Sequence, residues 1–320
     1  MSNNASLIVF GPVPSRRLGQ SLGINNIPPK ICTYSCIYCQ VGKTARMKLE
    51  RSLFYETSEV VDAVEKTVQN FRKKNELIDY LSFVPDGEPT LDLELGEKIE
   101  QLKRLGIKIA VISNASLIWR EDVRKDLKKA DWVSLKIDAL SPEIWHKVDR
   151  PHPYLSLEKI KDGIKIFSHE YQGDLNMETM LVADVNDQES ELYKIARFIK
   201  ELSIHRCYIS IPTRPPTLKW VKAPGPEKIA MAHQIFSEHE LPVECLLGFA
   251  EHSFGSTGDI ERDLLSITSV HPMREQEIRS FLEREGEDWA VVTRLIEEKK
   301  LTKINYRNQS FFLRRISRLK

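Results

Sequence analysis

Short apolar runs alternate with amphipathic segments from about residue 54 to about residue 240. The runs are rich in β-branched residues and nearly continuous in apolar content, which is typical of parallel strands covered on both faces. Five of them predict buried strands: Ile78–Val84, Ile107–Ser113, Trp132–Ile137, Asn176–Val182 and Cys207–Ile211. Helical patterns lie between and around them, at residues 60–71, 99–105, 119–129, 158–167, 189–202 and 227–240. The alternation predicts right-handed βαβ crossovers and a parallel sheet, open or barrel-like.

Small polar or charged residues follow the predicted strands. Gly87-Glu88-Pro89 follows the first strand, Ser113-Asn114 ends the second and Asp138 follows the third. In parallel α/β folds, ligand sites collect at the carboxyl ends of the strands. A polar loop needs no ligand to explain it, but Glu88 and Asn114 stand directly at strand ends. We therefore interpret this edge of the sheet as a candidate site.

The balance of charge limits the classes of partner. The chain has 47 Lys and Arg against 46 Asp and Glu, a formal net charge of +1. No global field draws such a chain onto nucleic acid or anionic lipid, so such binding needs a local patch. No apolar run approaches ~18 residues, which argues against a membrane-spanning helix, and the first residues lack the pattern of a secretory signal. We therefore expect a cytoplasmic protein of one α/β barrel or two domains.

The pattern changes from residue 259 onward. Residues 259–268, 274–284 and 288–299 predict three short helices, and Leu301–Tyr306 and Ser310–Ile316 predict a β-hairpin. Three helices followed by a hairpin are typical of a winged helix. We therefore predict a core domain over residues 1–255 and a winged-helix-like domain over residues 259–320.

Three of the five cysteines, Cys32, Cys36 and Cys39, stand within eight residues in a Cys-x3-Cys-x2-Cys spacing. An odd count without a secretory signal argues against a disulfide framework. A structural zinc ion needs four protein ligands, and no histidine precedes His146. An iron–sulfur cubane on three cysteines leaves one iron open for a substrate or cofactor. The spacing favours this cluster; a zinc site with a distant ligand and three unrelated thiols are the alternatives.

The cysteine loop, with Tyr38 before its last cysteine, resembles the cluster loop of the radical S-adenosylmethionine (SAM) superfamily. Gly87-Glu88-Pro89 looks like that family's motif for the amino group of SAM, and Ser113-Asn114 is similar to its ribose-contacting position. Asp138 matches a further position that often faces the cofactor. The resemblance covers roughly residues 8–250 and implies a partial (β/α)6 TIM-like barrel.

Three further stretches resemble the group that contains the tRNA wyosine synthetases and uncharacterised relatives. They are residues 11–19 (GPVPSRRLG), 86–91 (DGEPTL) and 149–152 (DRPH). The wyosine enzymes carry additional cysteines upstream for a second cluster, whereas this chain has no cysteine before Cys32. The resemblance therefore indicates the core of the group and leaves the substrate open.

The resemblance implies that Cys32, Cys36 and Cys39 bind three irons of a [4Fe–4S] cluster and that SAM binds the fourth. An electron from a reducing partner such as ferredoxin or flavodoxin then cleaves SAM to methionine and a 5′-deoxyadenosyl radical, which abstracts hydrogen from a substrate. Glu88 offers an acceptor for an ammonium group. Asn114 offers a donor and an acceptor to ribose hydroxyls.

Several basic side chains complete the candidate site. Lys136 alternates with Asp138 on one face of its strand, where it could meet the SAM carboxylate or neutralise a neighbouring acid inside the barrel. Four arginines are candidates for a phosphate or carboxylate of the substrate, with solvated basic loops as the alternative: Arg16, Arg17, Arg150 and Arg214.

The last residues suggest a macromolecular partner. Residues 303–320 hold six Lys and Arg and no acid, a composition that could track a phosphate backbone. The preceding helical segment is acidic, so it is poorly suited to binding in the DNA major groove. We expect this domain to dock an RNA or protein substrate, with tRNA modification favoured. The competing function is a non-catalytic iron–sulfur or zinc-binding regulator, which would leave Glu88 and Asn114 without a role.

Overall fold

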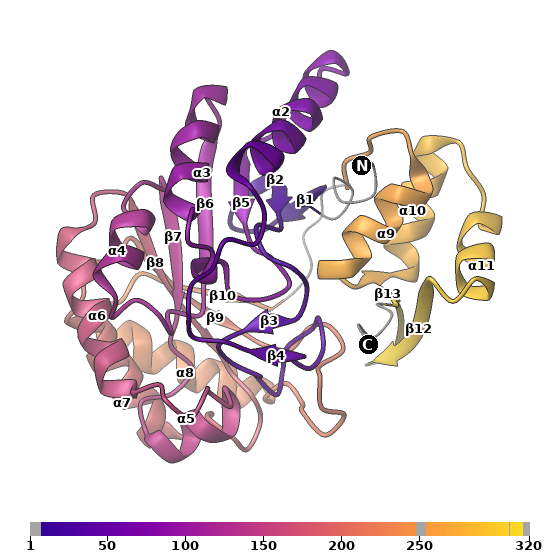
Figure 1. The fold of residues 1–320 in the computed structure, drawn as a ribbon. Helices are drawn as coiled ribbons and strands as arrows, with labels where there is room; N and C mark the ends of the chain where they lie inside the picture. The colour runs from indigo at the N-terminus through magenta and orange to yellow at the C-terminus, as the bar shows by residue number, and fades with distance from the viewer. Residues whose placement is uncertain (1–7, 248–253, 307, 316–320) are drawn as a thin grey trace.

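The computed structural model describes residues 8–247, 254–306 and 308–315. Its main element is an eight-stranded sheet with the order β1-β2-β5-β6-β7-β8-β9-β10 (Figure 1). β1 and β2 are antiparallel, and every pair from β2 to β10 is parallel. The strands are β1 (Val9–Ser15), β2 (Gly19–Ile24), β5 (Tyr80–Phe83), β6 (Lys108–Ser113), β7 (Trp132–Lys136), β8 (Asp174–Met180), β9 (Arg206–Ser210) and β10 (Val243–Leu246).

Helices connect the parallel strands and pack around the curved sheet (Figure 1). They are α2 (Thr57–Lys73), α3 (Leu95–Leu102), α4 (Glu121–Leu127), α5 (Pro142–Val148), α6 (Leu157–Glu170), α7 (Glu189–Lys200) and α8 (Pro226–Glu238). In α2, Val60, Val64, Val68 and Phe71 recur on one face and are buried in the core. Each such side chain stabilises the fold by about 1.5–3 kcal/mol through burial alone. The expected partial TIM-like barrel is confirmed.

The five predicted strands correspond to β5–β9, whereas β1, β2 and β10 were not predicted. β1 contains Pro12 and Pro14, which disfavour a strand in the sequence pattern. They are tolerated because β1 is an edge strand with one neighbour, β2. β10 is the other edge, and only Leu246 of its four residues is fully buried. Edge strands lack the continuous apolar run by which the central strands are recognised.

The C-terminal residues contain the three helices and the hairpin that the sequence predicts. The elements are α9 (Ile260–Val270), β11 (Met273–Arg274), α10 (Glu275–Glu285), α11 (Ala290–Glu297), β12 (Leu301–Tyr306) and β13 (Gln309–Arg314). The short strand β11 adds to the hairpin and gives a three-stranded sheet. Of the basic residues predicted to lie here, Arg307, Arg318 and Lys320 fall outside the described residues, as does Ile316.

The C-terminal elements share their core with the first strand of the barrel. Phe10 and Val13 of β1 are buried in the same hydrophobic cluster as Ile278, Leu295 and Phe312. Backbone contacts reinforce this packing: the Gly255 N–H donates to the Pro12 carbonyl at 2.7 Å, and the Ser266 hydroxyl donates to the Val9 carbonyl at 3.0 Å. Figure 1 shows α9 beside the β1 edge of the sheet. The edge strand is therefore covered by the C-terminal elements.

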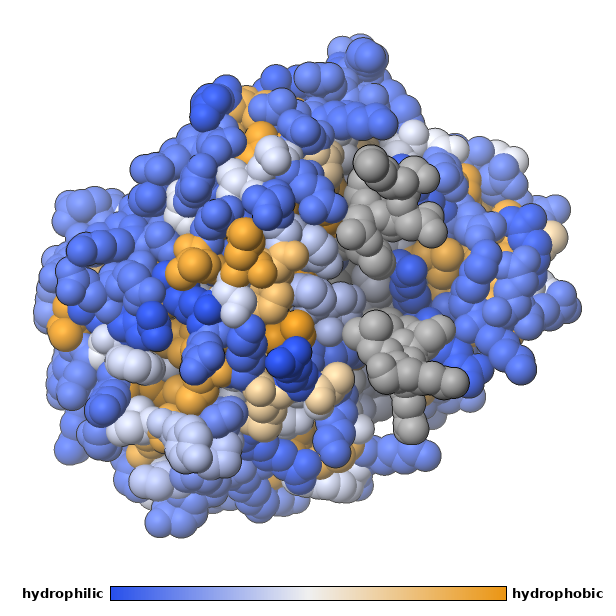
Figure 2. Space-filling view, viewed as in Figure 1, coloured by the Kyte–Doolittle hydropathy of each residue, from blue (hydrophilic) through white to orange (hydrophobic). Residues whose placement is uncertain are grey.

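The surface in Figure 2 is mostly hydrophilic, with hydrophobic residues in small groups over the barrel. Leu53 and Leu93 are among the exposed apolar side chains of the described residues. Within the described part of the chain, no helix combines the length and the apolar character needed to cross a membrane.

Candidate functional site

The cysteine loop lies between β2 and α2 and is fastened by two very short parallel strands. β3 (Ile31–Cys32) pairs with β4 (Arg46–Met47), so the first cysteine belongs to a strand. The Lys48 N–H donates to the Cys32 carbonyl at 3.1 Å. At the other end, the Thr217 hydroxyl donates to the Cys39 carbonyl at 2.8 Å. Both ends of the cysteine motif are therefore anchored to neighbouring segments, one through backbone and the other through the Thr217 side chain.

A cavity of about 420 Å³ opens beside this loop. Cys32, Cys36 and Cys39 line its wall, together with Gly87 after β5 and Lys136 at the end of β7. The part of the cavity beside the cysteines thus lies at the carboxyl ends of the parallel strands, the edge at which α/β folds build ligand sites. These five predicted site residues meet there, and three of the predicted arginines also line the cavity.

Glu88 is turned away from this cavity and is 1% exposed. Its carboxylate accepts hydrogen bonds from the Thr90 N–H at 3.1 Å and hydroxyl at 2.6 Å, and from the Ser113 hydroxyl at 2.7 Å. The Asn114 N–H donates to its other oxygen at 2.8 Å. Burial raises the pKa of Glu88, and these donors oppose the shift. Glu88 thereby ties the turn after β5 to the end of β6, and Pro89, in the same turn, is also buried.

Asn114 connects this turn to the cysteine loop. Its side-chain amide donates to the Thr33 hydroxyl at 2.8 Å and approaches the Cys32 sulfur at 3.5 Å. The Ser116 hydroxyl also contacts Thr33, at 2.6 Å. Thr33 is fully buried. It was missed by the sequence analysis because a threonine between two cysteines carries no distinctive signal.

A second hollow of about 10 Å³ lies behind Tyr38, Tyr34 and Lys136, which line both spaces. Asn114 and Asp138 line this hollow, which has room for about one water molecule. Asp138 accepts a hydrogen bond from the Tyr38 hydroxyl, and it also accepts from the Met180 N–H at 2.7 Å. In this structure Tyr38 therefore separates Asp138 from the main cavity.

Asp149 completes the polar group around Tyr38 and was missed as a site residue. It accepts a hydrogen bond from the Cys36 thiol at 3.4 Å, and the Tyr38 hydroxyl lies at the same distance. Burial and the neighbouring Asp138 raise the pKa of Asp149 well above its ordinary value. The DRPH stretch, residues 149–152, was a sequence signal from which Asp149 could have been identified.

An ion-paired group forms another part of the cavity wall. Arg17 pairs with Glu178 of β8, and the Lys136 ammonium lies 3.7 Å from the same carboxylate. Burial would raise the pKa of Glu178, but Arg17 and Lys136 outweigh it and lower the pKa to about 2. For Lys136, the loss of solvation is outweighed by Asp138 and Glu178, which raise its pKa. Lys136 thus neutralises acidic neighbours inside the barrel, which is one of the two roles that the sequence left open.

The predicted substrate arginines occupy different places. Arg16 and Arg17 line the cavity from the turn between β1 and β2. Arg214 lines it too, but its guanidinium donates to the Pro272 carbonyl and contacts His271, both from the C-terminal elements. Arg150 is exposed beside the cysteine loop, outside both cavities as described. Glu178 was missed because its strand was interpreted as an apolar run.

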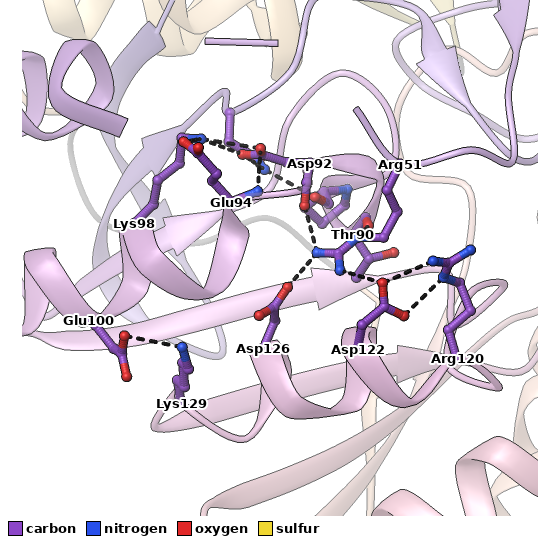
Figure 3. Close-up of polar contacts among 12 residues, drawn as sticks. Arg51, Thr90, Asp92, Glu94, Lys98, Glu100, Arg120, Asp122, Asp126 and Lys129 are labelled. Atoms are coloured by element: carbon purple, nitrogen blue, oxygen red, sulfur yellow. Dashed lines mark hydrogen bonds and ion pairs between the residues drawn. The ribbon is translucent and has the colours of Figure 1, made fainter. Parts of the chain in front are cut away.

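A network of ion pairs around the buried side chains of Arg51, Asp92 and Lys98 holds the segment that follows Glu88 (Figure 3). The Arg51 side chain is 3% exposed and donates to the Thr90 carbonyl at 3.0 Å and to the Asp92 carbonyl at 2.7 Å. Arg51 also pairs with Asp122 and Asp126 of α4, and Lys98 of α3 pairs with Asp92 at 3.1 Å. The turn after β5 is therefore fixed to two helices.

The donor set and the cavity fit an iron–sulfur cluster better than a single ion. Among the described residues, no three His, Cys, Asp or Glu side chains converge as ligands of one metal ion. The three cysteines instead line one wall of a cavity much larger than an ion. Burial, and then the charge of Glu88, raise the pKa of the Cys32 thiol to about 12, so that a positively charged group is needed to hold thiolates here.

Comparisons with known proteins agree with this geometry. Residues 26–199 match the family model described as the radical SAM superfamily. The chain is 43% identical over 311 residues to a UPF0026 protein of Methanocaldococcus jannaschii, covering 97% of this chain and 96% of that protein. It is 23% identical over 227 residues to a probable dual-specificity RNA methyltransferase RlmN of a Thermotoga species, covering 67% of this chain and 61% of that protein.

A solved structure of TYW1 with a lysine–pyruvate adduct bound has the same core fold. It superposes with a TM-score of 0.54 at 17% identity, covering 68% of this chain and 73% of that one. Enzymes of the radical SAM family use a [4Fe–4S] cluster and SAM. The expected similarity to the group of TYW1 and its uncharacterised relatives is confirmed. The chain belongs to the radical SAM superfamily and is an enzyme of that type.

Proposed function

We propose that Cys32, Cys36 and Cys39 hold a [4Fe–4S] cluster and that SAM binds beside it in the cavity. The observation that carries this proposal is the position of all three cysteines on one cavity wall, next to Gly87 at the end of a parallel strand. When bound, the cluster and SAM supply a 5′-deoxyadenosyl radical that abstracts a hydrogen atom from the substrate. The competing function, a non-catalytic regulator, is not supported by membership in a superfamily of enzymes.

The side chains of this wall have distinct parts in the proposal. Gly87 leaves room for the cysteine loop, while Glu88, Pro89 and Ser113 hold the turn in place. Asn114 spans the turn and the loop, within reach of a ribose near Cys32. Lys136 offers an ammonium group to the SAM carboxylate if Tyr38 moves aside. Asp138 reaches SAM only after the same movement, since Tyr38 now occupies its carboxylate.

RNA is the substrate class that we favour, and tRNA within it. The similarity to a probable RNA methyltransferase and the fold shared with TYW1 support this choice. Exposed basic residues on the described hairpin, Lys303 and Arg315, could meet a phosphate backbone. A protein substrate is the second candidate. The electron would come from a small reductant such as ferredoxin or flavodoxin.

Two measurements test the proposal. Anaerobically reconstituted protein, reduced with dithionite, should bind iron and convert SAM to 5′-deoxyadenosine and methionine. Cys36→Ala should lose both properties, whereas Cys245→Ala, outside the loop, should keep them. A wild-type protein that binds one zinc ion and leaves SAM intact would refute the enzyme proposal. For the substrate, nucleosides from tRNA of cells with and without the gene would be compared by mass spectrometry, and identical profiles would direct the search to protein.

A further inference from the structure

The wall of the main cavity carries more positive than negative charge. Five cationic side chains line it: Arg16, Arg17, Lys30, Lys136 and Arg214. Two carboxylates, Asp86 and Glu178, belong to the same wall. Lys30 pairs with Asp86 at 3.0 Å, and Glu178 is shared between two cations. Arg214 pairs with Glu277, outside the wall, at 3.8 Å, so the five cations meet three carboxylates and the described wall keeps a small excess of positive charge.

The cofactors of the proposed function leave this excess unchanged. A [4Fe–4S] core on three thiolates carries one net negative charge, and SAM carries one net positive charge. The two charges cancel when both groups are bound. A site that is closed around its substrate must match the remaining cations with another anion, because unpaired charges are costly away from water.

Among these cations, Arg16 is the one whose surroundings favour binding such an anion. Its neighbour Arg17 pairs with Glu178, whereas Arg16 makes no hydrogen bond or ion pair within the part of the chain that the structure describes. Its side chain is accessible to solvent at the rim of the cavity. Partial loss of solvation at that rim, and then the charge of Arg17, lower the pKa of its guanidinium, while the charges of Glu178 and Glu244 oppose the shift. Both effects would be relieved by an anion beside it.

Arg214, which is buried after β9, supplies a second positive charge on the same cavity wall. It is fixed by the Pro272 carbonyl and by His271, and the carboxylate of Glu277 lies 3.8 Å away. Burial lowers the pKa of Arg214 to about 10. The charges of Arg274 and Arg16 contribute to this shift, and the charge of Glu277 opposes it. Arg16 and Arg214 thus line the same cavity. His271, from the C-terminal elements, lines the cavity beside them.

We propose that Arg16, on a cavity wall that also carries the fixed charge of Arg214, binds an oxyanion group of the substrate, a phosphate or a carboxylate, at the rim of the cavity. A guanidinium suits either group because its N–H donors match two oxygens at once. The inference rests on the proposed function, to which it adds the chemistry of a substrate group. It also separates the four predicted arginines: Arg16 binds, Arg17 and Arg214 supply charge, and Arg150 takes no part.

The test measures anion binding to the full-length, reconstituted, SAM-loaded protein by calorimetry at low ionic strength. Inorganic pyrophosphate is the probe in one arm and citrate in the other. We expect the wild type to bind at least one of them, and Arg16→Gln to bind it at least about tenfold more weakly. Tighter binding of pyrophosphate would indicate a phosphate, and tighter binding of citrate a carboxylate.

Arg104→Gln is the matched control, because Arg104 is an exposed arginine just before β6 that lies at the same edge of the sheet as Arg16 but does not line the cavity. Its affinity for both probes should equal that of the wild type. Equal losses in Arg104→Gln and Arg16→Gln, or no binding by the wild type, would overturn the inference. If Arg16→Gln does not fold, wild-type crystals soaked in tungstate decide the question: an anion bound away from Arg16 rejects the proposal.

Failure of this inference can be distinguished from failure of the proposed function. Formation of 5′-deoxyadenosine without anion binding would reject the oxyanion site and leave the radical SAM proposal intact. Anion binding without SAM cleavage would reject the radical SAM proposal and leave the oxyanion site intact. The absorption of the reconstituted cluster, unchanged between wild type and Arg16→Gln, would show that the variant acts on binding alone.

Discussion

The backbone carbonyl of Ile31 lies so close to Gly87 that a Cβ built on Gly87 would come within 2.0 Å of its oxygen. The two residues form a parallel β-bridge, and the Glu88 N–H donates to the same carbonyl at 3.2 Å. Cys32 is the next residue along. The position of the first cysteine therefore depends on the absence of a side chain at residue 87.

Gly87→Ala should displace the cysteine loop while the barrel stays folded. The added methyl meets backbone atoms, which cannot rotate away as a flexible side chain can. We expect the iron bound after reconstitution to fall by at least about half, as measured by iron analysis and cluster absorption. Gly225→Ala is the control, since a Cβ there meets nothing within 4 Å. Full iron content in Gly87→Ala would contradict the coupling between this glycine and the loop.

Arg51→Ala should destabilise the whole barrel. Removal of Arg51 leaves two carbonyls and the carboxylates of Asp122 and Asp126 without their buried partner (Figure 3). Breaking a buried ion pair from one side costs about 3–5 kcal/mol, which urea unfolding would measure. Lys125→Ala, which removes an exposed pair with Glu121, should leave the midpoint unchanged. Equal midpoints for Arg51→Ala and the wild type would show that the network carries little stability.

The central part of the fold can be predicted from sequence because burial on both faces produces a continuous apolar run. β5 to β9 are found in this way, whereas β1, with Pro12 and Pro14, is not. The C-terminal helices and hairpin can also be predicted. Their attachment to the barrel cannot, because it depends on Phe10 and Val13 facing a partner more than 240 residues away in the chain.

Short motifs locate the site but not the contacts inside it. The cysteine spacing and Gly87-Glu88-Pro89 predict residues that the fold does bring together. Sequence could not show that Glu88 is enclosed by Thr90, Ser113 and Asn114, or that Tyr38 covers Asp138. Glu178 was missed for a related reason: a charged residue inside a strand is significant only when its partners, Arg17 and Lys136, are known.

Phe10→Ala should loosen the C-terminal elements although Phe10 belongs to the barrel. Its ring lies over Gly23 and is buried in the core that includes Leu264 and Phe281. Loss of a buried phenylalanine costs about 3–5 kcal/mol. We expect faster amide hydrogen exchange in α9 and α10 than in the wild type. Phe71→Ala, in the barrel core, should speed exchange in α2 instead, and the same pattern in both variants would refute a shared core at β1.

The acid dependence of stability should reveal the Arg17–Glu178 pair. Glu178 has a pKa of about 2 in the folded state against an ordinary value of 4.5, because Arg17 and Lys136 outweigh its burial. A carboxyl with a lowered pKa stabilises the fold above pH 4.5, here by about 3 kcal/mol, and this contribution is lost as the pH falls from 4.5 to about 2.

Arg17→Gln should therefore be less stable than the wild type by about 1–3 kcal/mol at pH 7 in urea unfolding. The difference should shrink at pH 3 and vanish near pH 2, because protonated Glu178 no longer needs its cation. Arg206→Gln, which breaks an exposed pair with Glu244, should follow the wild type at every pH. A difference between Arg17→Gln and the wild type that stays constant from pH 7 to pH 3 would mean that Arg17 stabilises through its packing against Trp132 and Tyr208 rather than through Glu178.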